Sequence, residues 1–204
     1  MIPLLLSPEG MRVLVVGGGR VALRKCMHFK GAELTVVSEE VMPEVERAAG
    51  SVVRKRTTPS EVYGMMEGFD VIVAATDDAA MNGEIRDEAI RRGIYVNSAH
   101  GGGNMVIPSV LRRERYTVSV SSEGKLPAFP PYVVEELDSF LDKRFDVMFD
   151  VLYELRGECA GKGTQAERSA FLRRAARDPE VNRLAREGDA ASAIERARTL
   201  GVPE

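Results

Sequence analysis

The chain has 204 residues, of which 44% are apolar and 29% are charged, and its formal net charge is −3. This composition is typical of a globular protein with one full domain and a smaller one, and the weak negative charge gives no reason to expect nucleic acid as a partner. No apolar run approaches the roughly 20 residues of a membrane-spanning helix, and the opening MIPLLL is too short for a secretory signal and lacks its basic flank. Cys26 and Cys159 match no metal-ligand spacing, so we expect no metal site. Two isolated thiols suggest a reducing interior rather than a disulfide scaffold, and we therefore expect a cytoplasmic protein without membrane association.

A glycine-rich turn between a strand and a helix is the strongest local signal. Residues 13–16 (VLVV) form a short apolar run of the kind found in strands that are buried on both faces. Three glycines follow at 17–19, and the next residues favour a helix up to Lys30, with Gly31 as its C-terminal stop. The chain therefore begins with a strand, a glycine turn and a helix.

The turn matches the dinucleotide-binding fingerprint G-x-G-x-x-A at Gly17, Gly19 and Ala22. The first glycine permits the tight turn, the second lets the backbone approach a pyrophosphate, and the alanine allows the helix to pack closely on the strand. The helix N-terminus then offers free N–H groups to the phosphates. A glycine-rich turn that binds nothing is the alternative. We predict a bound dinucleotide, with its pyrophosphate at Gly17, Gly18, Gly19, Arg20 and Val21.

The end of the second predicted strand bears on the choice of dinucleotide. This strand covers residues 34–37 (LTVV), and Ser38, Glu39 and Glu40 follow it. An acid at this position usually holds the ribose 2′-hydroxyl, and two acids would repel a 2′-phosphate. We therefore expect NAD rather than NADP, with Ser38 and Glu39 at the ribose. The alternative is that the acids only charge the first turn of the next helix.

The following segments continue the alternation of strands and helices. We expect a short helix up to Ala49 and a brief strand at residues 52–53, followed by the basic cluster RKR at 54–56, which we interpret as a solvated strand end. The next helix begins at Pro59, breaks near Gly64 and closes at Gly68.

A second buried strand, residues 71–75 (VIVAA), ends in small side chains. Ligands of open parallel sheets bind at the carboxyl edge, so Ala75 and Thr76 are candidates for contact with the cofactor. Asp78 is expected to cap a helix that ends at Gly93, and residues 94–96 form the next strand. The pattern predicts an α/β fold with a Rossmann-type, doubly wound parallel sheet.

The last strand of this pattern leads into NSAH (residues 97–100) and the glycines at 101–103. A flexible loop at the carboxyl end of a strand is where this architecture carries its chemistry. His100 is therefore the candidate catalytic residue, the alternative being an ordinary loop histidine. His28 lies on the first predicted helix and is interpreted as a packing or surface residue.

The remaining third of the chain is mostly helical. After a strand at 116–121 (YTVSVS), prolines delay the next helix until about Tyr132, and one long helix with an apolar stripe from Val134 to Leu155 follows. Such a stripe needs a partner, either the C-terminal helices or a second copy of the chain. Glycines at 157–163 mark a linker, and a helix at 165–177 precedes two shorter ones. We interpret the arginines of this tail as a solvated face rather than a site for an anion.

Four motifs in this order resemble those of the precorrin-2 dehydrogenases, also called siroheme synthase N-terminal domains. They are GGGRVALRK, ATDD followed by Asn82, IPS at 107–109, and the strand that leads into SSEGKLP. The resemblance covers residues 1 to about 140 and implies three parts. These are a Rossmann domain (1–113), a dimerisation and active-site region (114–156) and a small α-helical C-terminal domain (157–204). It also implies a homodimer that oxidises precorrin-2 to sirohydrochlorin with NAD, some members inserting Fe(II) as well.

One departure concerns the catalytic position. Where the family usually reads Asn-Val-Val-Asp, with the aspartate regarded as catalytic, this chain has Asn97, Ser98, Ala99 and His100. The resemblance therefore implies that the His100 imidazole takes the proton as hydride leaves, while Ser121 orients the substrate or the base. The missing aspartate keeps open an alternative, a non-catalytic protein that senses the dinucleotide. It also leaves metal insertion in question.

Precorrin-2 is a tetrapyrrole rich in carboxylates, so its site needs cations and polar groups. A polar turn between two strands is the alternative explanation for the arginines near 112–115. The residues that we expect at the substrate are Asn97, Arg112, Arg113 and Lys125, with Arg115 nearby.

Overall fold

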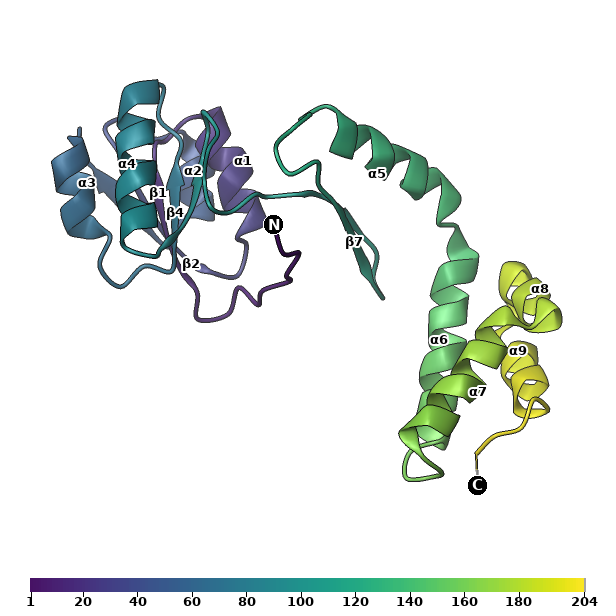
Figure 1. Ribbon diagram of the computed structural model, residues 1–204. Coiled ribbons are helices and arrows are strands. Elements are labelled where there is room, and N and C mark those ends of the chain that lie inside the picture. The colour runs from purple at the N-terminus through teal and green to yellow at the C-terminus, as the bar shows by residue number, and fades with distance from the viewer. Residues whose placement is uncertain (204) are drawn as a thin grey trace. The chain divides into compact units, whose positions relative to one another are not determined.

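The computed structural model describes residues 1–203, which form two compact units (Figure 1). The first unit comprises residues 1–108 together with 121–126. The second comprises residues 109–120 and the chain from Pro127 onward. Among the residues described, no helix is long and apolar enough to cross a membrane.

The first unit is built on one parallel sheet of five strands. Its strands run in the order β3-β2-β1-β4-β5, which places β1 at the centre and confirms the doubly wound topology expected from the sequence. The strands are β1 (Arg12–Val16), β2 (Glu33–Ser38), β3 (Ser51–Arg54), β4 (Val71–Ala74) and β5 (Tyr95–Ser98).

Two helices cover each face of this sheet (Figure 1). Alternate residues of β1 face opposite sides, so Val13 and Val15 join one core and Leu14 and Val16 join the other. Because both faces are buried, the strand is apolar from Val13 to Val16, as the sequence predicted. The helices over the first core are α1 (Arg20–His28) and α2 (Pro43–Ala48), and those over the second are α3 (Pro59–Met65) and α4 (Ala79–Arg91).

The helix ends agree with the expected signals in most places. Asp78 caps α4 by accepting a hydrogen bond from the N–H of Met81, as expected. α3 begins at Pro59, as expected, and it ends at Met65, one residue past Gly64 and before the turn at Gly68. A capping box between Thr58 and Glu61 stabilises the N-terminus of α3.

The outer edge of β5 is paired with a side chain rather than with another strand. Asn104 accepts the N–H of Val96 at 2.7 Å and donates to the carbonyl of Ile94 at 3.0 Å, and the N–H of Met105 donates to the carbonyl of Val96. Gly103 has no room for a side chain here, because a Cβ would lie 2.1 Å from the Val96 oxygen. The loop that follows β5 is therefore fastened along its edge.

The second unit begins with a hairpin and a helix. Strands β6 (Ser109–Arg112) and β7 (Thr117–Val120) pair antiparallel, and α5 (Phe129–Phe140) packs against both. The helix begins earlier than expected, since Pro130 and Pro131 lie in its first turn, where a missing N–H costs nothing.

Four further helices complete the second unit: α6 (Lys143–Glu158), α7 (Gln165–Arg177), α8 (Pro179–Glu187) and α9 (Ala190–Arg198). The single long helix expected from Val134 to Leu155 was wrong, because the chain turns at Leu141 and Asp142 caps α6. Val151, Leu155 and Phe171 are fully buried in the core that α6 shares with the C-terminal helices. Part of the apolar stripe is thus covered within the chain.

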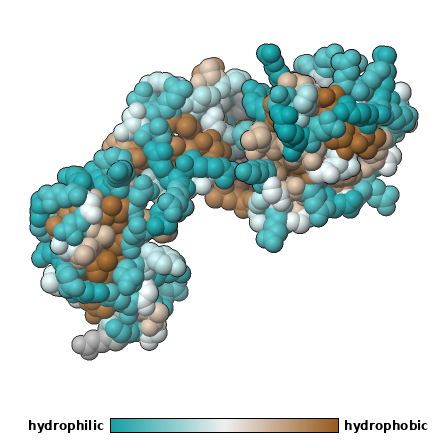
Figure 2. Space-filling model, turned by 180° about the vertical axis from the view of Figure 1, so that it is seen from behind, coloured by the Kyte–Doolittle hydropathy of each residue, from teal (hydrophilic) through white to brown (hydrophobic). Residues whose placement is uncertain are grey.

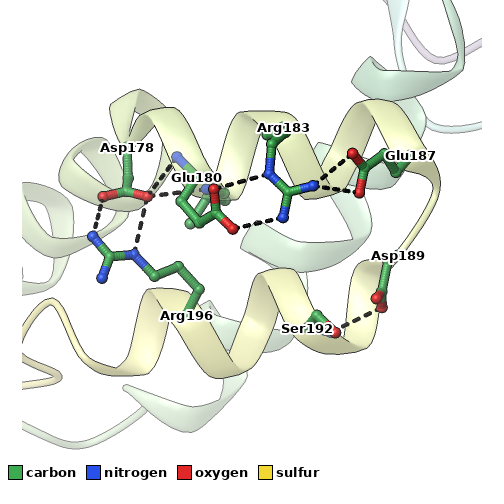
Figure 3. Close-up of polar contacts among 8 residues, drawn as sticks. Asp178, Glu180, Arg183, Glu187, Asp189, Ser192 and Arg196 are labelled. Atoms are coloured by element: carbon green, nitrogen blue, oxygen red, sulfur yellow. Dashed lines mark hydrogen bonds and ion pairs between the residues drawn. The ribbon is translucent and has the colours of Figure 1, made fainter.

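Ion pairs tie the C-terminal helices together (Figure 3). Asp178 caps α8 through the N–H groups of Glu180 and Val181 and pairs with Arg196 of α9 at 2.8 Å. Arg183 bonds Glu180 and Glu187 on either side of it along α8. Hydrogen bonds from Arg196 and from the α8 backbone lower the pKa of Asp178 to about 2.

Candidate functional site

A large cleft lies at the carboxyl edge of the five-stranded sheet. Its volume is about 1070 Å³, and the segments that follow β1, β2, β3 and β4 line it together with the first turns of α1 and α4. The chain connects β1 to β2 on one side and reaches β4 on the other, so the cleft includes the point where the strand order reverses. Open α/β sheets bind their ligands there.

The glycine turn between β1 and α1 forms the floor of this cleft. A Cβ on Gly17, whose φ is +120°, would lie 2.3 Å from the carbonyl oxygen of Ala75, and a Cβ on Gly18 would lie 2.1 Å from that of Glu40. A Cβ on Gly19 would have no heavy atom within 4 Å. The first two glycines are therefore needed for the fold, and the third leaves open space above the backbone.

The start of α1 faces this open space. Gly19 is the N-cap and has no side chain to satisfy the first N–H groups, and the first turn holds no acid. Ala22 is fully buried against the core, so the helix packs closely on the sheet. Free N–H groups, a positive helix end and room above Gly19 fit a pyrophosphate.

The side of the cleft formed by the segments after β2 and β3 carries charges of both signs. Ser38 and Glu39, the residues expected at a ribose, line it, and Lys55 and Arg56 line it as well, although the sequence placed them on a solvated strand end. Lys55 is paired with Glu61, and this bond together with those from Thr58 lowers the pKa of Glu61 to about 2. The clue to Lys55 and Arg56 was their position: they follow β3, whose carboxyl end lies at the same sheet edge as those of β1 and β2.

The residues after β4 connect the cleft to the candidate catalytic histidine. Ala75 and Thr76, the candidates for contact with a cofactor, line the cleft. The fully buried Asn82 of α4 bonds the Thr76 backbone and also lies 2.8 Å from Nδ1 of His100. Sequence reasoning gave Asn82 no functional role, although it shares a buried helix face with Ile85 and Ala89, and a lone amide on such a face is a usable signal.

Asn97 and Ser98 hold the loop that carries His100. Asn97 is 9% exposed, and its amide nitrogen donates to the carbonyl of Met105 at 3.1 Å, while its side-chain oxygen is buried and has no partner. The hydroxyl of Ser98 accepts the N–H of His100 at 3.3 Å. The Asn97 amide nitrogen therefore holds the loop in place, and only the side-chain oxygen is left to bond a ligand.

The turn after β7 contains Ser121 and Lys125. The Ser121 hydroxyl accepts the N–H of Glu123, whose φ of 53° is the only positive value for a non-glycine residue among residues 1–203. Lys125 lies 3.5 Å from the Glu123 carboxylate and is largely exposed. Both predicted residues thus belong to one tight turn in the first unit.

The predicted arginines lie in the second unit and differ in their contacts. Arg113 pairs with Asp138 at 2.8 Å and donates to the carbonyl of Leu141, so it stabilises the end of α5. Arg115 pairs with Asp150 at 2.9 Å. Arg112 is exposed and, within the described part of the chain, makes no ion pair. Of the three, Arg112 has a guanidinium that is available to a ligand.

Comparisons with known proteins identify the family of this chain. Residues 4–109 match the family described as "Putative NAD(P)-binding". The chain is 37% identical over 152 residues to "Precorrin-2 dehydrogenase" of Bacillus subtilis (strain 168), covering 71% of this chain and 91% of that protein. It is 36% identical over 148 residues to "Siroheme synthase 2" of Aeromonas salmonicida (strain A449), covering 70% of this chain and only 30% of that longer protein.

A solved structure shows the same fold over nearly the whole chain. It is "SirC, precorrin-2 dehydrogenase", which superposes with a TM-score of 0.74 at 26% identity and covers 98% of this chain and 100% of its own. The similarity therefore includes the helical C-terminal part as well as the sheet.

Proposed function

Because the chain belongs to the family of precorrin-2 dehydrogenases and siroheme synthases, we propose that it oxidises precorrin-2 to sirohydrochlorin. It is an NAD-dependent oxidoreductase of siroheme biosynthesis. The observation that carries the proposal is the dinucleotide cleft, with His100 tied to its wall through Asn82 and Thr76.

The first unit supplies the cofactor site. When bound, NAD takes the hydride that leaves the tetrapyrrole. The N–H groups of Arg20 and Val21 at the start of α1 hold the pyrophosphate above Gly19, and Glu39 holds the ribose. Ala75 and Thr76 at the end of β4 line the wall that leads towards His100.

The substrate is a polycarboxylate, so its site needs donors. In the first unit, Lys125 supplies a cation, and Asn97 and Ser121 supply polar contacts beside His100 and after β7 respectively. Arg112 of the second unit has an exposed guanidinium that suits a carboxylate of the same substrate class. Arg113, which the sequence also placed at the substrate, has a different role in this proposal: its bonds to Asp138 and Leu141 hold the hairpin against α5.

Exposed aromatic side chains on α5 and α6 support a homodimer. Phe129, Tyr132, Phe140, Phe149 and Tyr153 are between 37% and 67% exposed. Figure 2 shows apolar residues at the surface of the second unit as well as the first. The rings of Phe129 and Tyr132 lie 6.5 Å apart between centroids, and those of Phe149 and Tyr153 lie 6.0 Å apart. Exposed apolar groups of this kind mark interaction surfaces, so we assign these side chains to contact with a second copy of the chain.

The assay adds precorrin-2 to the purified protein with NAD in the absence of oxygen and follows NADH and the spectrum of sirohydrochlorin. We expect both to rise together, and more slowly with NADP, because Glu39 and Glu40 repel a 2′-phosphate. A protein that binds NAD and produces no NADH would instead be a dinucleotide sensor.

Iron insertion is proposed as a second, separable activity, because several relatives are named siroheme synthases. It is tested by adding Fe(II) to the protein with sirohydrochlorin in the absence of NAD. The rate of siroheme formation must exceed that of the same mixture without protein. An equal rate would remove iron insertion and leave the dehydrogenase proposal in place.

A further inference from the structure

The side-chain amide of Asn82 is buried and uses all of its hydrogen-bonding capacity. Its oxygen accepts the N–H of Thr76 at 3.1 Å and the Thr76 hydroxyl at 2.8 Å. Its nitrogen donates to the carbonyl of Thr76 at 2.9 Å and lies 2.8 Å from Nδ1 of His100. An amide has two acceptor sites and two donors, and all four are engaged here.

The Thr76 backbone fixes which way round this amide lies. A backbone N–H can only donate, so the Asn82 atom facing it must be the oxygen, and a backbone carbonyl can only accept, so the atom facing it must be the nitrogen. A flipped amide would lose both bonds and place like groups together. The amide N–H that remains therefore points at His100.

This orientation determines the tautomer of His100. Nδ1 can accept the Asn82 N–H only while it carries no proton, so the proton of the neutral ring lies on Nε2. His100 is exposed, and its Nε2 is not the nitrogen that Asn82 contacts, so Nε2 is the ring atom left to bond a ligand. A lone pair on Nε2 would require a proton on Nδ1 and would set two N–H groups against each other.

We propose that Asn82 is a positioning residue that holds His100 in the Nε2–H tautomer, so that His100 donates a hydrogen bond to a carboxylate of the tetrapyrrole. This role rests on the proposed function and replaces the proton-accepting role that the sequence suggested. The substrate then loses a hydride to NAD and a proton to water, and His100 holds the macrocycle in place. Asn82 is itself anchored at the capped start of α4, where its N–H bonds the Asp78 carbonyl.

The tautomer is measured by NMR of protein labelled with ¹⁵N-histidine. The chain has two histidines, so His28→Gln, an exposed change at the end of α1, leaves only the His100 ring to observe. In the neutral ring we expect an unprotonated Nδ1 and a protonated Nε2. A protonated Nδ1, or an even mixture of tautomers, would overturn the proposal.

Two substitutions of Asn82 test its part. Asn82→Ala removes the donor, so the two ring nitrogens should move towards a mixture of tautomers. Asn82→Asp replaces the donor with an acceptor, so Nδ1 should become protonated. A ring that keeps its original pattern in either variant that folds, as judged by its amide spectrum, would show that Asn82 does not set the tautomer.

The donor role is tested with substitutions of His100 in the NAD-bound protein, using sirohydrochlorin binding and turnover. Glutamine can donate a hydrogen bond and is not a base, so His100→Gln should retain most of the affinity. His100→Ala should lose about tenfold to a hundredfold, the usual effect of a hydrogen bond to a charged group. Equal losses of roughly 10²–10⁴ in turnover for both variants, with unchanged affinity, would instead identify a base.

These measurements separate the inference from the proposed function. The NMR pattern needs no substrate, so it stands or fails whatever reaction the protein catalyses. If the tautomer is as expected and sirohydrochlorin does not bind the wild-type protein, the proposed function fails and the donor role fails with it. If sirohydrochlorin binds and turnover proceeds with the opposite tautomer, only the inference fails.

Discussion

Replacing Gly19 with valine is expected to abolish NAD binding and to leave the fold intact. The backbone at Gly19 is extended, with φ −91°, and a Cβ would have no heavy atom within 4 Å, so a valine fits the protein. Its branches would fill the space where the pyrophosphate meets the N-terminus of α1. The cost in stability is about 1 kcal/mol, because valine is a poor N-cap.

The loss of affinity follows from the bonds that the phosphate can no longer make. Hydrogen bonds to a charged group contribute about 1.5–3 kcal/mol each, and the first two N–H groups of α1 are blocked. The dissociation constant should therefore rise by roughly 10²–10⁴-fold. Isothermal titration calorimetry with NAD measures this, and thermal unfolding without NAD checks the fold.

Two other glycines serve as controls. Gly64→Val adds the same side chain at an exposed position in α3 outside the cleft, where a Cβ also meets nothing within 4 Å, and should leave NAD affinity unchanged. Gly17→Ala should instead destabilise the protein, because its Cβ would lie 2.3 Å from the Ala75 oxygen. A folded Gly19→Val protein that binds NAD with wild-type affinity would refute the assignment of the pyrophosphate to this turn.

Three further predictions concern other parts of the molecule. Light scattering at micromolar concentration should show a dimer, and a monomer alone would contradict the role given to the aromatic surface of α5 and α6. Asp178→Asn should lower the free energy of unfolding at pH 7 by about 1–2 kcal/mol, because asparagine keeps the cap and loses the Arg196 ion pair. Since folding lowers the pKa of Asp178 from 3.8 to about 2, its stabilisation is complete above about pH 4 and is lost as the pH falls towards 2, so urea unfolding of the two proteins should converge there. Gly103→Ala should speed hydrogen exchange at the Val96 amide, since its Cβ would push the loop away from β5, and unchanged exchange would show that the loop is not held as described.

The sheet and the glycine turn at its centre were predictable because their signals are local. Apolar runs, glycine stops and the capping residue Asp78 lie next to the elements that they define. The turn at Leu141 was missed because the apolar stripe continues through it, and only the capping aspartate at 142 marks the second helix. Composition alone cannot show such a break.

The substrate side was less predictable because it depends on pairing between distant residues. Arg113 and Arg112 are adjacent in the sequence and look alike, yet Asp138 engages only Arg113. The role of Asn82 likewise depends on Thr76 and His100, which are 6 and 18 residues away along the chain. Which donor meets which acceptor is decided by the fold.

The side-chain pairing of Asn104 along β5 also limits how this protein can associate. An open strand edge recruits further strands, from a second copy or from an unfolded chain, and here the loop after β5 already uses the groups that such a strand would need. The same loop carries His100. Substitutions that loosen it should therefore cause aggregation by strand addition as well as loss of activity, and a dimer of the intact protein has to form through a surface other than this edge.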